Sequence, residues 1–229
     1  MIGIIGAMEI EIASLVDILT EKKEITVGKL LFTHGKYSGK EVVVVKCGIG
    51  KVFAASAATA MILTFPNIKL IINLGVAGGL HPALKQGDFA VAQHSVQHDY
   101  DLTPEGLPIG NVAGYDNRNF ACDKTAVQNM CSVLEAENFI HKKGVIVSGD
   151  QFIACDKKTA WLKKEFSAIA CDMETASIAQ VCDLFSIAFL GVRAISDNAS
   201  EGAALDFNAF CAQAAKRSIA AVKQFLKSM

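Results

Sequence analysis

The sequence predicts an α/β fold of three layers, with helices on both faces of a mixed, mainly parallel central sheet. Two observations carry this prediction. Short apolar runs alternate along the chain with segments of helical periodicity, and only one hairpin, around residues 38–40, interrupts the alternation. The run at 42–45 is apolar at every position, which is typical of a strand covered on both faces.

The chain opens on a buried strand at 2–5, and Gly6 turns it into a helix over 8–19. Glu9 and Glu11 flank the apolar stripe of this helix, each about 80° from its centre at 100° per residue. Periodicity therefore does not choose which of the two lines a cleft at the end of the strand. The stripe itself comprises Met8, Ile12, Leu15, Val16 and Leu19.

Two glycine-rich segments follow strands in the first half. After a hairpin over 30–36 and 41–47, Gly48-Ile49-Gly50-Lys51 leads into an Ala-rich helix over 52–63. This turn matches neither the dinucleotide fingerprint, since Phe53 stands at the third glycine, nor the phosphate-binding P-loop, since Val52 stands at its Ser/Thr position. A buried strand at 69–74 ends in the glycine cluster 75–79, which allows close approach of a ligand or of another backbone segment.

The middle of the chain contains its longest irregular stretch. A strand at 89–93 precedes His94, His98, Asp99 and Asp101; no second cluster at ligand spacing accompanies them, so a polar loop is favoured over a metal site. Residues 101–119 contain three Gly and two Pro and no periodicity, which is typical of a lid or a binding loop.

The second half alternates regularly. We expect a helix over 122–138, a strand at 144–147, a helix over 156–166, and a long closing helix that starts at Asp206 and turns Phe207, Phe210, Ala214, Ala221 and Phe225 inward.

The stretch 170–200 is predicted to organise the site. A strand ending at Cys171 delivers Asp172 and Glu174, and a second strand at 187–195 delivers Arg193 and Asp197. Open α/β sheets bind ligands where their strands end. Glu174 heads an inward helical stripe of Ile178, Val181, Cys182 and Phe185, and the helix N-terminus favours its ionised form. An inward carboxylate requires a partner, which is either a ligand or Arg193.

Composition narrows the class of protein. Hydrophobic residues make up 52% and mean hydropathy is +0.34, an excess that predicts an apolar surface closed by self-association. The segment 53–65 is too short to span a bilayer and no basic leader is apparent, so we expect a cytoplasmic chain with no membrane partner. Seven Cys without a C-x-x-C pair indicate reduced core thiols. A net charge of −1 without a basic run argues against a nucleic-acid partner. No linker divides the chain, so residues 1–229 are expected to form one domain.

Several separated stretches resemble one enzyme family, the 5′-methylthioadenosine/S-adenosylhomocysteine nucleosidases, whose fold is that of the purine nucleoside phosphorylases. The likeness runs nearly end to end. It lies in Gly3-Ile4-Ile5-Gly6-Ala7-Met8-Glu9, Gly48-Ile49-Gly50-Lys51-Val52, residues 75–79, Ser148-Gly149-Asp150, Met173-Glu174 and Arg193-Ala194-Ile195-Ser196-Asp197.

The resemblance implies hydrolysis of the N-glycosidic bond of 5′-methylthioadenosine, S-adenosylhomocysteine and 5′-deoxyadenosine, with no cofactor and no metal. It implies that Glu11 activates the attacking water and that Asp197 protonates the leaving adenine near N7. It further implies substrate contacts from Glu174 and the Met173 backbone to the ribose, from Phe152, the Ile153 backbone and Gly78 to the base, from Arg193 near ribose and water, and from Met8, Ile49, Ser196 and Phe207.

Three positions depart from the family pattern. Asp172 replaces a common Glu, Val76 replaces a common Ser, and the loop at 102–108 looks shorter and lacks aromatic residues. In the family this loop reaches the site of the neighbouring subunit. The resemblance therefore implies a homodimer with Leu102, Leu107 and Pro108 at the 5′ pocket.

Three other functions remain open. The altered loop, with His98 and Asp101, keeps an aminodeoxyfutalosine nucleosidase possible. A phosphate-dependent nucleoside phosphorylase needs a cationic cradle, and neither 3–9 nor 75–79 contains Arg or Lys. A non-catalytic nucleoside sensor would not need Glu11 and Asp197 together.

Overall fold

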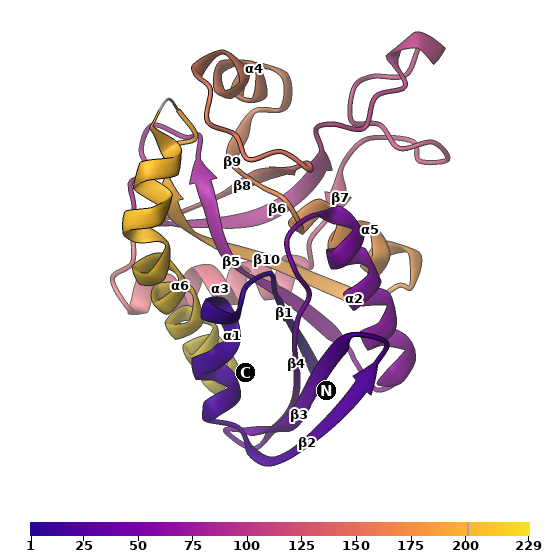
Figure 1. Ribbon diagram of the computed structural model, residues 1–229, viewed down its shortest axis with the longest axis vertical. Coiled ribbons are helices and arrows are strands. Elements are labelled where there is room, and N and C mark those ends of the chain that lie inside the picture. Colours follow the sequence, from indigo (N-terminus) through magenta and orange to yellow (C-terminus); the bar gives the residue numbers. More distant parts are fainter. Residues whose placement is uncertain (201) are drawn as a thin grey trace.

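The computed structural model describes residues 1–200 and 202–229 (Figure 1). Ten strands of this part of the chain join one sheet, and six α-helices and one 3₁₀ helix accompany them. The strands are β1 Ile2–Gly6, β2 Thr20–Val27, β3 Leu30–Tyr37, β4 Lys40–Lys46, β5 Leu70–Gly79, β6 Phe89–Gln97, β7 Phe120–Ala121, β8 His141–Ser148, β9 Ala168–Asp172 and β10 Ala188–Asp197. The helices are α1 Glu9–Asp17, α2 Lys51–Thr64, η1 Thr103–Glu105, α3 Lys124–Ala136, α4 Asp156–Phe166, α5 Thr175–Leu184 and α6 Ala203–Ser228.

The sheet is mixed, as predicted, and its longest ladders are parallel: β5 with β10, and β6 with β8. Its order is β10-β6-β8-β9-β5-β1-β4-β3-β2, and β10 also pairs with β5. Strands β5, β10, β6, β8 and β9 therefore form a closed ring, from which β1, β4, β3 and β2 extend as an open wing. Because β1, β5 and β10 run parallel, their carboxyl ends lie at the same edge, where ligands bind in such folds.

Helices cover both faces of the sheet, which confirms the three-layer prediction. Figure 1 shows α1, α3 and α6 on one side of the strands and α2 and α5 on the other, and α4 packs beside β8 and β9. The long helix α6 packs on β5 and β10, and its Ser218 hydroxyl accepts a hydrogen bond from the backbone N–H of Gly75 at 3.1 Å. Helix α6 thus packs against the two strands, β5 and β10, that carry part of the expected site.

The sequence reading missed two strands. Every residue of β2 is exposed and the strand is rich in Lys and Glu, so no apolar alternation marks it. Strand β7 is two residues long and pairs only with β6. Both are recognised by their backbone partners, which a sequence pattern does not contain.

Other predictions were wrong in detail. The glycine cluster 75–79 does not follow a strand; it forms the second half of β5 and pairs with β9 and β10. Phe185 was expected to be inward, but it caps the end of α5 and is 40% exposed. Phe210 was also expected to be inward and is 37% exposed, while α6 begins one turn before Asp206, at Ala203.

Two features bear on the expected class of protein. None of the helices in 1–200 and 202–229 combines the length and hydropathy needed to cross a membrane. All seven cysteines are free, and six of them are buried.

Candidate active site

A cavity of about 590 Å³, including its open mouth, lies at the carboxyl ends of β1, β5, β9 and β10. Its wall combines apolar side chains with four acidic residues: Glu11, Asp172, Glu174 and Asp197. Eight other residues that the sequence assigned to the site also belong to the wall. The full lining is Ala7, Met8, Glu11, Ile49, Val76, Ala77, Gly78, Gln151, Phe152, Ile153, Cys171, Asp172, Met173, Glu174, Ser196, Asp197 and Phe207.

Glu11 is the acid that the first helix turns toward the cavity, which decides between it and the exposed Glu9. Its side chain folds back over the start of α1, and one oxygen accepts hydrogen bonds from the backbone N–H groups of Ala7 at 2.7 Å and Met8 at 2.9 Å. The other oxygen accepts from the N–H of Val76 at 3.1 Å. Three N–H donors fix the carboxylate although only 1% of the residue is exposed.

Burial raises the pKa of Glu11, while the nearby positive charge of Arg193 and the three backbone donors oppose that rise. These opposing influences act on a carboxyl group that lines the cavity, which is the position required of a group that accepts a proton there.

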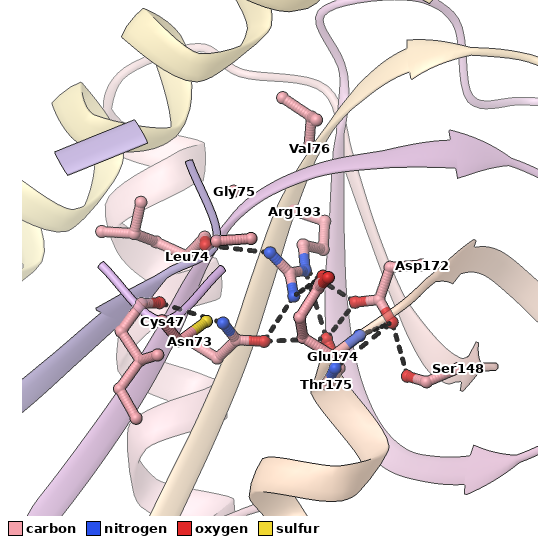
Figure 2. A network of polar contacts seen from close by, with 12 residues as sticks. Cys47, Asn73, Leu74, Gly75, Val76, Ser148, Asp172, Glu174, Thr175 and Arg193 are labelled. Carbon is pink, nitrogen blue, oxygen red and sulfur yellow. Dashed lines mark hydrogen bonds and ion pairs between the residues drawn. The ribbon is translucent and has the colours of Figure 1, made fainter. Parts of the chain in front are cut away.

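Arg193 is the only buried Lys or Arg among the described residues, with 0% of its surface exposed. Figure 2 shows its guanidinium among Asn73, Asp172 and Glu174. Its Nε donates to Asp172 Oδ2 at 2.7 Å, and its Nη1 donates to the carbonyl of Leu74 at 2.8 Å. Its Nη2 donates to the side-chain oxygen of Asn73 and lies 3.5 Å from Glu174 Oε2. Arg193 does not line the cavity, so it acts on the wall through the carboxylates around it.

Asp172, one of the departures from the family pattern, anchors this guanidinium. Besides Arg193, it accepts hydrogen bonds from the Ser148 hydroxyl at 2.5 Å and from the Thr175 hydroxyl and backbone N–H. A buried arginine needs this kind of partner, because an unpaired buried charge costs several kcal/mol. The shorter aspartate thus has a defined structural task.

Glu174 is both paired and exposed to the cavity, so the two alternatives left open by the sequence are compatible. One oxygen faces Arg193, and the other accepts a hydrogen bond from the backbone N–H of Gly50 at 2.9 Å. Glu174 is the N-cap of α5 rather than part of its first turn. The expected preference for the ionised form is outweighed, because burial raises the pKa of Glu174 to about 7.

Gly75 is the glycine in the cluster whose absent side chain matters most. A Cβ on this residue would lie 2.5 Å from Glu11 Oε1 and would also collide with Nη1 of Arg193. Its φ of +150° is rarely adopted by other residues. The glycine therefore allows Glu11 and Arg193 to approach one another across β5. At this position the glycine cluster makes room for other segments of the protein.

Asp197 ends β10 on the cavity wall and is 3% exposed. Its Oδ1 accepts a hydrogen bond from the backbone N–H of Ala199 at 2.8 Å, and its Oδ2 accepts from the Ser196 hydroxyl at 2.8 Å. Burial raises the pKa of Asp197, although these two donors oppose the rise. A carboxyl group with a raised pKa is suited to donate a proton.

The mouth of the cavity is aromatic. Phe152 and Phe207 meet edge to face, with ring centroids 5.6 Å apart, and Phe152 is half exposed. Gly78 also lines the cavity, and a Cβ on it would lie 2.9 Å from Ala199 and 3.1 Å from Asp197 Oδ1. The aromatic rings in the lining offer faces on which a flat ligand can stack.

The structure gathers most of the predicted site residues but not all of them. Glu11, Asp197, Gly78, Met173 and Glu174 line one cavity, together with the remaining predicted contacts Met8, Ile49, Phe152, Ile153, Ser196 and Phe207. Leu102, Leu107 and Pro108 do not line it, and they lie around η1 in the irregular segment.

Sequence reasoning missed the polar residues that support the site from behind. Asn73 was read as part of an apolar strand, yet it accepts from Arg193 and donates to the carbonyl of Ile5 at 2.9 Å. Thr175 and Ser148 tie Asp172 in place. A lone Asn within a buried strand was the available signal, because a buried amide needs partners.

No group of three or more His, Cys, Asp or Glu in residues 1–200 and 202–229 is arranged to hold a metal ion. His98 and Asp99, which suggested a metal site in the sequence, both lie close to Gly149. The carboxylate of Asp99 accepts hydrogen bonds from Lys51 Nζ and from the N–H of Asp150.

Comparisons with known proteins agree with this geometry. The model of the phosphorylase superfamily matches residues 1–227. A 5′-methylthioadenosine/S-adenosylhomocysteine nucleosidase of Staphylococcus haemolyticus is 41% identical over 228 residues, which cover 99% of each chain. The crystal structure of a nucleosidase of the same name from Neisseria meningitidis, in complex with methylthio-immucillin-A, is 35% identical, with a TM-score of 0.96 over 100% of this chain and 99% of that one. The structure of futalosine hydrolase of Helicobacter pylori strain 26695 is also 35% identical, with a TM-score of 0.95 over 100% and 97%.

The raised pKa of Glu174 predicts a pH dependence of stability. Between its ordinary pKa of 4.5 and about 7, the folded protein keeps a proton that the unfolded chain has lost, so the free energy of unfolding falls as pH rises. In Glu174→Gln this contribution is absent. Urea unfolding of both proteins at pH 5 and pH 7 checks it: wild type loses more stability over this interval than the variant. Equal losses in the two proteins would contradict the shift.

Proposed function

We propose a specific reaction for this chain, which belongs to the phosphorylase superfamily and, within it, to the 5′-methylthioadenosine/S-adenosylhomocysteine nucleosidases. These enzymes are N-glycosyl hydrolases. The proposed reaction is hydrolysis of 5′-methylthioadenosine, S-adenosylhomocysteine and 5′-deoxyadenosine to adenine and the 5′-substituted ribose. In it, Asp197 is the general acid and Glu11 activates the water. Residues 1–229 would act as one nucleosidase domain, since the family match spans 1–227.

One observation carries the proposal: Glu11 from α1 and Asp197 from β10 line the same cavity, although 185 positions separate them in the chain. Breaking a ribose–adenine bond builds positive charge on the sugar and negative charge on the base. A pair of carboxyl groups, one protonated and one ionised, serves both needs, as in inverting glycosidases.

Glu11 would take a proton from the attacking water as the water oxygen bonds to C1′ of the ribose. Its three backbone donors and the nearby guanidinium of Arg193 favour the carboxylate over the protonated form. They also orient it, since together they bind both of its oxygens. The carboxylate further stabilises the positive charge that develops on the sugar.

Asp197 would act as the general acid. As the bond from C1′ to the base breaks, its electron pair passes to adenine, and the proton of Asp197 is transferred to N7. The burial that raises the pKa of this carboxyl group supports the role, because it keeps the acid protonated to higher pH. Ser196 and the N–H of Ala199 then stabilise the carboxylate that is left.

The remaining wall would hold the substrate. We assign the ribose hydroxyls to Glu174 and the backbone of Met173, and the adenine to Phe152, the backbone of Ile153 and Gly78. Met8, Ile49, Ser196 and Phe207 would complete the contacts. Arg193 would not contact the substrate, since its guanidinium nitrogens donate to protein groups. It would instead keep Glu11 and Glu174 in place.

Transfer to phosphate is the rival reaction, and the lining of the cavity argues against it. Its seventeen residues include no Lys, Arg or His, and Glu11 would repel an anion next to the sugar. Water as the acceptor needs no cationic cradle.

A second substrate class follows from one comparison. A futalosine hydrolase shares the fold with a TM-score of 0.95. We therefore keep 5′-substituted adenosines with a bulkier 5′ group, such as aminodeoxyfutalosine, as a second candidate that the loop at 101–119 would admit.

We propose in addition that the active species is a homodimer. Leu102, Leu107 and Pro108 lie outside the cavity of their own chain, so they would close the 5′ end of the neighbour's cavity. Large apolar side chains exposed at the start of α2, Val52 at 76% and Phe53 at 60%, support an interface.

The reaction is tested by incubating the protein with 5′-methylthioadenosine, S-adenosylhomocysteine, 5′-deoxyadenosine and aminodeoxyfutalosine, with and without phosphate. We expect adenine release from the first three at rates independent of phosphate, and comparison of kcat/KM ranks the 5′ groups. Inactivity on all four substrates, or a requirement for phosphate, would overturn the proposal.

Replacing the general acid tests the mechanism. Asp197→Asn should lower kcat by about 10² to 10⁴, the range for one positioned proton transfer. Binding of a non-hydrolysable methylthioadenosine analogue, measured by calorimetry, should remain. A variant with the kcat of wild type would exclude the assigned role. If wild type has no turnover and Asp197→Asn loses binding of the analogue, the protein is a nucleoside sensor instead.

The homodimer is checked by light scattering on the active protein. Twice the chain mass of 24.4 kDa is expected. Leu107→Asp should lower kcat/KM for the 5′-thio substrates by weakening the apolar 5′ pocket, whereas a fully active monomer would contradict the shared site.

A further inference from the structure

The glycine turn Gly48-Ile49-Gly50-Lys51 resembles a phosphate-binding loop without matching one, and the proposed reaction gives most of it no task. In the structure it leads into α2, and the N-terminus of that helix carries free N–H groups and a partial positive charge. Such a terminus commonly binds an anionic ligand. Here two carboxylates of the protein itself occupy it.

Those two carboxylates come from different segments, since Asp150 follows β8 and Glu174 precedes α5. The N–H of Gly50 donates to Glu174 Oε1 at 2.9 Å, and the N–H of the next residue, Lys51, donates to Asp150 Oδ1 at 2.7 Å. Gly50 has φ +106°, and a Cβ on it would lie 2.9 Å from the same oxygen of Asp150. The glycine therefore permits the second contact as well as the turn.

Asp150 is held at a second point. Its backbone N–H donates to Asp99 Oδ2 at 2.9 Å, and the other oxygen of Asp99 accepts from Lys51 Nζ at 2.7 Å. Lys51 Nζ also donates to Gln97 Oε1 at 3.1 Å. Lys51 and Asp99 are both largely shielded from solvent, so this ion pair is less screened than a surface pair.

These contacts connect two parts of the cavity wall. Asp150 lies two residues before Phe152 and three before Ile153, the residues assigned to the base, while Glu174 is assigned to the ribose. Neither Asp99, Lys51 nor Asp150 lines the cavity. Two consecutive N–H groups at the start of α2 thus set the spacing between the segment at 150–153, assigned to the base, and the carboxylate of Glu174, assigned to the ribose.

We propose that Asp150 and Asp99, through the N-terminus of α2, are positioning residues that hold the adenine-binding segment 150–153 in register with Glu174. This inference rests on the proposed function, because it takes 152 and 153 as the base contacts. Asp150 itself is exposed, so its hydrogen bond contributes to the placement of the segment more than to the stability of the fold.

The test compares Asp150→Ala, Asp150→Asn and Asp99→Ala with wild type on 5′-methylthioadenosine. A positioning role affects binding of ground state and transition state alike, so KM rises while kcat changes little. We expect KM to rise about threefold to tenfold in the two Ala variants, which is the size of one ordinary hydrogen bond. The inhibition constant of adenine should rise by the same factor, because the displaced segment binds the base.

Asp150→Asn keeps an oxygen that can accept from Lys51, so it should remain within about twofold of wild type in both constants. The matched control is Asp123→Ala. Asp123 also caps a helix, since its carboxylate accepts from the N–H of Ala126 at 2.8 Å at the start of α3. If a variant only reduces the fraction of folded protein, the apparent kcat falls and KM is unchanged. This is the pattern that we expect of Asp123→Ala.

The outcomes are separable. If wild type releases no adenine from any substrate, the proposed function fails. If wild type is active and neither Ala variant changes KM or the inhibition constant of adenine, the positioning role is wrong. It is also wrong if Asp123→Ala raises KM equally, or if Asp150→Asn is as impaired as Asp150→Ala.

Discussion

The arrangement of this site depends on one buried positive charge. Arg193 has no contact with solvent, yet its guanidinium lies among Asp172, Glu174 and the more distant Glu11. Three carboxyl groups could not be gathered at the edge of one sheet without a cation, since each buried charge is costly on its own. Burial raises the pKa values of Glu11 and Glu174, and the nearby guanidinium of Arg193 opposes both rises.

The strand topology makes this arrangement possible. Strand β5 pairs with β1 in its first half and with β9 at its glycine end, while β10 runs beside it along nearly its whole length. The residues of three chain segments therefore converge around Gly75, where the absence of a side chain leaves room for Arg193 and Glu11. The carbonyl of Leu74 accepts a hydrogen bond from Nη1 of the guanidinium, and Thr175 and Asn73 add acceptors beside the carboxylates at Nε and Nη2. Glu11, Asp197 and the residues that support them are thus carried by strands and helix termini, whereas Phe152 lies in a loop and Phe207 in α6.

Helix termini recur as the means by which this protein places its acids. Glu11 bonds the first N–H groups around α1, Glu174 caps α5 and reaches the start of α2, and Asp150 meets the same start from the other side. Each carboxylate is oriented by backbone donors that cannot rotate away, which makes the placement less sensitive to side-chain motion. The electrostatics of the site are consequently built largely from main-chain dipoles and one guanidinium.

The sequence by itself determined the layers, the order of the main elements and the family, because hydrophobic period and turn residues are local properties that survive without coordinates. It also indicated that the carboxylates after β9 and within the last strand belong to a site. Its periodicity did not choose between Glu9 and Glu11, and the sequence neither placed Asn73 in a polar network nor predicted that Phe185 and Phe210 are exposed. Those outcomes depend on which strands become neighbours and on what covers each helix end. Only the tertiary structure decided them, since hydrogen bonds between segments more than a hundred residues apart leave no periodic trace in the chain.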